Sequence, residues 1–285
     1  MANLKEIRGR ITSIGSTMQI TSAMKMVAAA KLKKAQDAIV MLRPYSEKLT
    51  ELIENVSAGA ELEEVSTFTA EREVKKALYI VVTSNRGLAG AFNSSVVKEL
   101  NTQLQQVDFE TEILTVGKKA FDAVQRTKTV YANQSSVFDQ LSFDAVARFT
   151  EQVMKDYAEE KFDRVYVIYN KFINAATQEV ITEQVLPISM PEKSGEVETD
   201  YIFEPSAREI LENLIPKSIK TQVYKAILDS VAAEHGARMT AMHKATDNAQ
   251  ALKNELVITY NKARQAAITN EILEIVSGAE ALKGS

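Results

Sequence analysis

The stretch IRGRITSIGSTMQITSAMKMVAAAKLKKAQDAIVMLR, residues 7–43, carries the strongest structural signal in the chain. Apolar residues recur at 3-4 spacing on both sides of it, over about fifty residues in all, which is a heptad seam typical of paired helices. At about 1.5 Å per residue such a helix would be roughly 80 Å long and needs a long partner helix. Gly15 and Pro44 disturb the pattern, and the proline is expected to bend the helix near Arg43. The seam positions are Leu4, Ile7, Ile11, Ile14, Met18, Thr21, Lys25, Ala28, Leu32, Ala35, Ile39, Leu42, Ser46, Leu49, Ile53 and Val56.

The C-terminal part of the sequence supplies the partner helix. Residues 219–282 contain no proline, only two glycines and many alanines, so they strongly favour helix. Because the two helices bracket the chain, we expect an antiparallel pair with the intervening residues as a body at one end. Apolar residues able to wrap the first helix are Val223, Ile227, Val231, Met242, Ala245, Ala249, Leu252, Leu256, Tyr260, Ala263, Ala267, Ile268, Ile272, Ile275, Ala279 and Leu282.

The middle of the chain alternates strand and helix patterns. Strands are predicted at 75–84, 110–117 and 163–172, and helices at 93–104, 118–126 and 143–162. This order favours a small, mainly parallel sheet covered by helices, with an antiparallel edge strand at 178–188. The predicted fold is therefore mixed α/β and α+β: a long antiparallel coiled coil of the terminal helices, residues 1–58 and 206–283, and a Rossmann-like α/β domain at 74–190.

Charge is unevenly distributed along the chain. Residues 1–43 hold eight Lys and Arg against two acidic residues, a net +6, although the whole chain has a net charge of -4. This asymmetry favours an acidic partner surface for the first helix, and a solvated basic face is the alternative. The acidic total argues against nucleic acid as the main partner.

Composition excludes several chemistries. The chain has no cysteine and two histidines, which removes thiolate catalysis, disulfides and zinc–cysteine sites, and the two histidines form no HExxH pair. No run of about twenty apolar residues and no apolar leader is present, so we expect an intracellular protein without membrane insertion. We predict no catalytic residue, no cofactor site and no metal site.

One glycine-rich turn resembles a phosphate-binding loop. TSNRGLAGAFN, residues 83–93, follows a predicted strand and precedes a helix, but it matches neither G-x-x-x-x-G-K-[ST] nor G-x-G-x-x-G. A structural turn at Gly87 and Gly90 is the better interpretation. Carboxylates near the C-terminus, Glu271 and Glu274, are interpreted as solvated or partner-facing groups.

Several motifs together resemble one family. ITSAMKMVAAAKLKKAQ at 20–36, ARMTAMHKATDNA at 237–249 and YNKARQAAITNEILEIVSGAEA at 260–281 are similar to the terminal helices of the gamma subunit of F-type ATP synthase. TSNRGLAGAFN and YNKFINAATQ are similar to its central domain. The resemblance covers nearly the whole chain, and its most specific part is the I-T-x-E-x-x-E-x-x-x-G-A pattern from Ile268 to Ala279.

The resemblance implies a function as a rotor. The paired helices would be the shaft inside a ring of alpha and beta subunits, and the α/β domain would be the foot, next to the epsilon subunit and the membrane c-ring. The complex would lie on the cytoplasmic face of a bacterial inner membrane, with this chain peripheral to it. The resemblance also implies contacts with the beta subunits or their bearing by Met24, Lys25, Met26, Arg264, Gln265, Thr269 and Glu271, and contacts on the c-ring side by Tyr201, Phe203 and Glu204.

The sequence departs from the family pattern at three places. Lys25 stands where many members carry an acidic residue, and Ala89 where many carry cysteine. In AAEHGARM, residues Ala233, His235 and Gly236 depart from the usual S-E-x-A-A-R-M. A glycine inside a helix costs about 1 kcal/mol relative to alanine, and close packing or local compliance could explain it. Two other functions stay open: a nucleotide-binding enzyme with a coiled-coil arm, and a passive coiled-coil tether.

Overall fold

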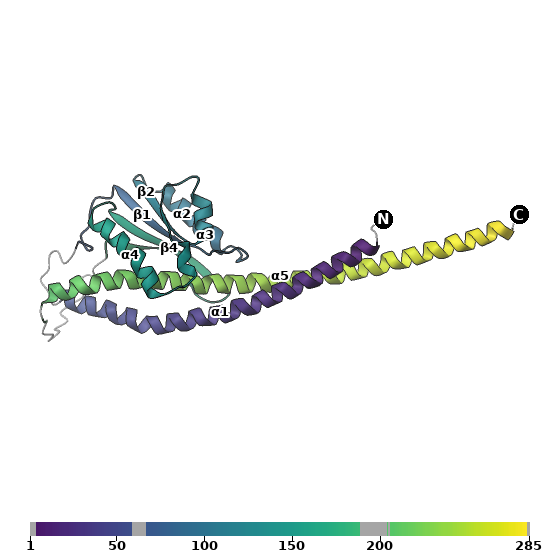
Figure 1. The fold of residues 1–285 in the computed structure, drawn as a ribbon, viewed down its shortest axis with the longest axis horizontal. Coiled ribbons are helices and arrows are strands. Elements are labelled where there is room, and N and C mark those ends of the chain that lie inside the picture. The colour runs from purple at the N-terminus through teal and green to yellow at the C-terminus, as the bar shows by residue number, and fades with distance from the viewer. Residues whose placement is uncertain (1–3, 59–66, 189–203, 205, 284–285) are drawn as a thin grey trace. The chain divides into compact units, whose positions relative to one another are not determined.

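The computed structural model describes residues 4–58, 67–188, 204 and 206–283 (Figure 1). The chain divides into two compact units. One consists of the residues up to Val27 together with those from Met239 onward, and the other is Ala28–Arg238. Two long helices, α1 (Leu4–Ala58) and α5 (Ala207–Lys283), contribute residues to both units.

The heptad seam of α1 is the covered side of that helix. Every seam position predicted from the sequence is buried or half-buried, whereas most of the residues between them are exposed. In the first unit α1 and α5 meet through side chains such as Thr21 and Thr246, whose hydroxyl oxygens are 2.8 Å apart. Both helices continue through an internal proline, Pro44 in α1 and Pro216 in α5. The prediction of two long terminal helices that pair through a heptad seam is confirmed.

The second unit contains a five-stranded sheet in the order β3-β2-β1-β4-β5. All neighbouring pairs are parallel except β4 and β5, which are antiparallel, as predicted for the edge strand. The strands are β1 (Lys76–Val82), β2 (Glu110–Val116), β3 (Val130–Asn133), β4 (Arg164–Phe172) and β5 (Gln178–Leu186). The shorter helices are α2 (Phe92–Gln105), α3 (Lys118–Val124), the 3-10 turn η1 (Ser135–Phe138) and α4 (Phe143–Ala158).

Helices cover both faces of the sheet, and strand β1 shows how. Its residues alternate between two apolar clusters because successive side chains of a strand point to opposite faces. Ala77, Tyr79 and Val81 pack with residues of α2 and α3, while Leu78, Ile80 and Val82 pack with residues of α4 and α5. A strand buried on both faces has no polar position to alternate with, which explains the continuous apolar run in the sequence.

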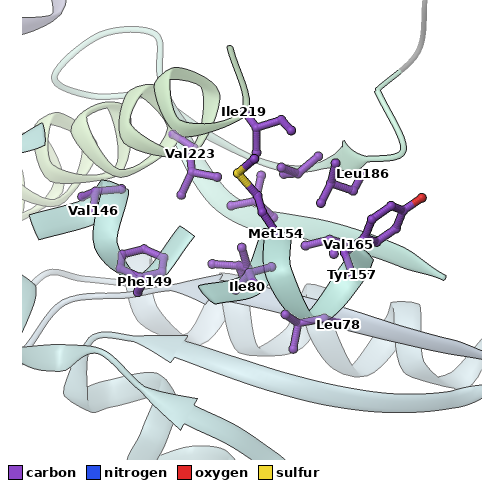
Figure 2. Close-up of a cluster of buried hydrophobic side chains, with 14 of the residues drawn as sticks. Leu78, Ile80, Val146, Phe149, Met154, Tyr157, Val165, Leu186, Ile219 and Val223 are labelled. Atoms are coloured by element: carbon purple, nitrogen blue, oxygen red, sulfur yellow. The ribbon is translucent and has the colours of Figure 1, made fainter. Parts of the chain in front are cut away.

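Helix α5 is part of the core of the α/β unit. Its residues Leu211, Ile215, Ile219, Val223 and Ile227 are completely buried. Figure 2 shows Ile219 and Val223 converging with α4 side chains, among them Phe149 and Met154, above Leu78 and Ile80 of the sheet. Leu49, Ile53 and Val56 of α1 belong to the same cluster. The α/β domain therefore shares its core with both long helices.

Candidate functional site

The glycine-rich turn after β1 is tied down by groups of its own chain. Ser84 N donates to Asn93 Oδ1 at 2.9 Å, and Asn85 Nδ2 donates to Ser135 O at 3.0 Å. Gly90 has a positive φ of 57°, which glycine adopts without strain. Leu88 has a φ of 62°, uncommon for a residue with a branched side chain, and its side chain is exposed.

The neighbouring helix end, the start of α3, does not offer free amides. Lys118 N donates to Asn85 Oδ1 at 2.9 Å, Lys119 N to Ser84 O at 3.1 Å, and Ala120 N to Thr83 Oγ1 at 2.8 Å. At Gly117 an added Cβ would lie 2.1 Å from Thr83 O, so the loop after β1 fills this space. Anion sites at helix ends bind through such first-turn amides. Here these amides already donate hydrogen bonds to atoms of the same chain. The geometry favours the structural-turn interpretation of Gly87 and Gly90.

The two histidines lie in different surroundings. His235 is half-buried, and burial, with smaller contributions from Arg238 and Lys31, lowers its pKa to about 4, so its ring is neutral at pH 7. His243 is exposed; its Nδ1 lies 3.5 Å from Lys25 Nζ and 3.5 Å from Asp247 Oδ2. Within the described residues, no group of three His, Cys, Asp or Glu side chains could hold a metal ion, and no helix is long and apolar enough to cross a membrane.

The proposed contact residues of α1 lie where its seam is polar. Thr21 is buried and hydrogen-bonded to Thr246, so this seam position is satisfied by a polar pair. Met24 and Lys25 are half-buried, whereas the Met26 side chain is 65% exposed. The structure therefore separates Met26, which faces solvent, from its two neighbours, which pack partly within the unit.

The proposed contact residues of α5 all lie on an uncovered segment. Arg264, Gln265, Thr269 and Glu271 are exposed, and so is every other residue from Arg264 to Glu280. The exposed residues include large apolar side chains at helical spacing: Ile268, Ile272, Leu273, Ile275 and Val276.

This segment corrects one expectation, because its apolar residues do not wrap the first helix. Thr21 faces Thr246, and antiparallel helices advance at the same rise, so Leu4, the first described residue of α1, reaches only as far as Ala263. Among the residues of α5 up to Glu280, whose burial the structure describes, Ala263 is the last half-buried one. From Arg264 to Glu280 none of the described parts of the chain covers α5, whose yellow end extends past the described part of α1 in Figure 1. Periodicity in the sequence showed an apolar face but not what covers it.

The candidate residues on the c-ring side are only partly visible. Tyr201 and Phe203 lie outside the described residues, and Glu204 is exposed.

One further site, on α5, was not predicted from the sequence. Arg238 forms an ion pair with Glu234, and its Nη2 donates to Arg86 O at 3.2 Å and to Gly87 O at 3.3 Å. The i, i+4 spacing of Glu234 and Arg238 was the available signal.

Comparison with known proteins gives one consistent family. Residues 3–282 match the family model described as ATP synthase. The ATP synthase gamma chain of Flavobacterium psychrophilum is 60% identical over 289 residues, covering all of both chains. The ATP synthase gamma chain of Geotalea daltonii is 43% identical, again over the full length of both.

Solved structures agree with these relatives. The central stalk and c-ring structure of the Tetrahymena thermophila mitochondrial ATP synthase contains a chain 26% identical to this one; the match has a TM-score of 0.61 and covers 79% of this chain and 99% of that chain. A rotor structure of the Euglena gracilis mitochondrial ATP synthase gives a TM-score of 0.65, covering 93% of this chain and 98% of that chain. At 22% identity the second likeness supports the fold alone.

Proposed function

The chain belongs to the gamma-chain family of ATP synthases, and we propose that it works in that complex as the central rotor, coupling rotation of the membrane c-ring to ATP synthesis or hydrolysis in the beta subunits. It is a non-catalytic subunit, and the chemistry belongs to the beta subunits. The observation that carries the proposal is the uncovered apolar end of α5, which extends beyond its helical partner.

The structure suits a stiff shaft. Residues 1–58 and 206–283 would act together as the shaft, with residues 74–190 as the foot. Two continuous helices sharing a heptad seam resist bending better than loops would, because along the seam the turns of one helix pack against the other. In the second unit, the α5 residues between Leu211 and Ile227 are packed in the hydrophobic core against the sheet. Torque on the α/β domain would therefore act directly on this helix.

We assign the ring contacts to side chains of α1 around Met26 and to the exposed side chains of α5 beyond Ala263. Arg264 and Gln265 would hydrogen-bond to loops of the beta subunits, and the apolar residues beside Thr269 and Glu271 would run in a bearing formed by the alpha and beta subunits. On α1, Met26 is the most accessible candidate, and Met24 and Lys25 lie beside it. The +6 segment would favour an acidic surface of the beta subunits.

The foot end would contact the other rotor parts. We propose that Glu204, together with Tyr201 and Phe203, faces the c-ring and that the epsilon subunit binds nearby. The chain would thus be peripheral, held at the cytoplasmic face of a bacterial inner membrane by the complex.

Reconstitution with alpha and beta subunits tests the rotor proposal. A probe attached to this chain should rotate in steps during ATP hydrolysis. If the full complex assembles and hydrolyses ATP but the probe never rotates, the chain is a tether. Saturable nucleotide binding by the isolated chain at micromolar ligand would instead favour the enzyme with a coiled-coil arm.

A further inference from the structure

One turn of α5 lies against the segments that follow the neighbouring strands β1 and β4. The loop after β1 and the loop after β4 both reach this turn, because β1 and β4 are neighbours in the sheet and parallel. Ala233 packs with Ala89 and Phe92 of the first loop and its helix, and Phe172 packs against the same group. An added Cβ on Gly236 would lie 3.2 Å from Ala175 Cα, so the second loop lies directly against the helix backbone.

This close approach explains the glycine in the middle of α5. Alanine at position 236 would require the backbone of Ala175 to shift by a few tenths of an ångström. The helix-propensity cost of Gly236, about 1 kcal/mol, is therefore offset by packing. Of the two explanations considered from the sequence, close packing is the one that the structure supports.

Arg238 adds hydrogen bonds and an ion pair to this apolar contact between α5 and the two loops. Its side chain is only 11% exposed, its Nη1 pairs with Glu234 of the same helix, and its Nη2 donates to the carbonyl oxygens of Arg86 and Gly87. Those carbonyls precede Leu88, which has a left-handed backbone conformation. One guanidinium thus holds both the helix and the strained loop, using the fixed fork of donors that lysine lacks.

We propose that Arg238 is a positioning residue that fixes the rotational setting of α5 on the α/β domain. The buried apolar residues of α5 already hold the helix against the sheet, but they make no bond to the loop after β1 beyond the contacts of Ala233. Charge-assisted hydrogen bonds have defined geometry and resist rotation of the helix relative to that loop. Because Arg238 is the last residue of its compact unit, the bonds act where α5 leaves the α/β domain. The inference rests on the proposed rotor function and adds a residue to it.

The bond itself can be tested on the isolated full-length chain. Arg238→Ala removes two hydrogen bonds from a charged donor, and hydrogen exchange of the amides in loop 83–91 should become about tenfold faster or more. Arg208→Ala is the matched control, because Arg208 also pairs with a glutamate four residues away on α5, Glu212, but is exposed. It should leave loop exchange unchanged. Unchanged exchange in Arg238→Ala would overturn the proposal.

The role in coupling needs the assembled complex in vesicles. Arg238→Ala should lower ion pumping per ATP hydrolysed relative to wild type and Arg208→Ala, while Arg238→Lys, which keeps the charge for Glu234 but not the fork, should give an intermediate ratio. A purely structural role would reduce assembly and leave this ratio unchanged in the complexes that form, a result that contradicts the proposal. If wild type itself fails to pump, the rotor function fails; if wild type pumps and both Arg238 variants match it, only this inference fails.

Discussion

The two halves of helix α5 have similar apolar patterns and opposite surroundings. Between Leu211 and Ile227 the apolar residues are completely buried against the sheet and α1, whereas Ile272 and Ile275, further along the same helix, are 54% and 68% exposed. Large exposed apolar patches mark interaction sites in soluble proteins. One half of the helix is therefore covered by its own chain, and on the proposed function the other half is where the partner subunits bind.

The largest expected effect comes from the buried half. Ile219→Ala should lower the free energy of unfolding by about 2–5 kcal/mol, because it leaves a cavity in a fully packed cluster. Ile272→Ala is the matched control at an exposed position and should change it by no more than about 0.5 kcal/mol. Denaturant unfolding of the full-length chain measures both. Equal losses would mean that the exposed half is also stabilised by its own chain.

The second test uses His235, the half-buried histidine of α5. The folded-state pKa of His235 lies near 4, below its ordinary value of 6.5, so the unfolded chain binds more protons between these pH values. The free energy of unfolding should therefore fall as the pH is lowered from about 6.5 toward 4. His235→Gln should flatten this slope. If His235→Gln keeps the wild-type slope, His235 is not the group responsible.

A smaller effect is expected at the polar seam position between α1 and α5. Thr21→Val removes one partner of the hydrogen bond to Thr246 and should cost about 1 kcal/mol, because the remaining hydroxyl loses a partner in a partly buried place. The double variant Thr21→Val with Thr246→Val should cost less than the two single changes added together. Thermal unfolding of the three variants tests this, and strict additivity would show that the two hydroxyls do not interact.

The smallest effect on stability is expected at the proposed ring contact. Replacing Arg264 and Gln265 by alanine should change the free energy of unfolding by no more than about 0.5 kcal/mol, since both side chains are exposed. In the assembled complex the same variant should lower ion pumping per ATP hydrolysed. Equal losses of stability and coupling would remove these residues from the contact.

Most of the fold could be predicted from periodicity, because each element has a clear repeat. The α1 seam was predicted position by position, and the strands β1, β2, β4 and β5 lie within one or two residues of their predicted bounds. Strand β3 was missed because its four residues, Val130–Asn133, are too few to show a pattern. The order of the strands could not be predicted, since it depends on contacts between segments distant in the sequence.

The site was less predictable for a physical reason. Exposure of the α5 end depends on where α1 begins relative to it, which no local pattern contains. The Arg238 bonds go to backbone carbonyls, and any residue type supplies those, so the sequence of loop 83–91 held no sign of them. Gly236 was noticed as a departure from helix propensity, and its reason became clear only with Ala175 in place.

Hydrogen exchange of α5 in the isolated chain and in the assembled complex with alpha and beta subunits tests the central claim most directly. Without partners, amides of residues 264–279 should exchange fast and those of residues 211–227 slowly, because only the latter are packed in a core. On assembly, residues 264–279 should become strongly protected while residues 211–227 stay as they were. If residues 264–279 exchange equally fast in the complex, the ring does not enclose this end of the helix and the rotor account is wrong.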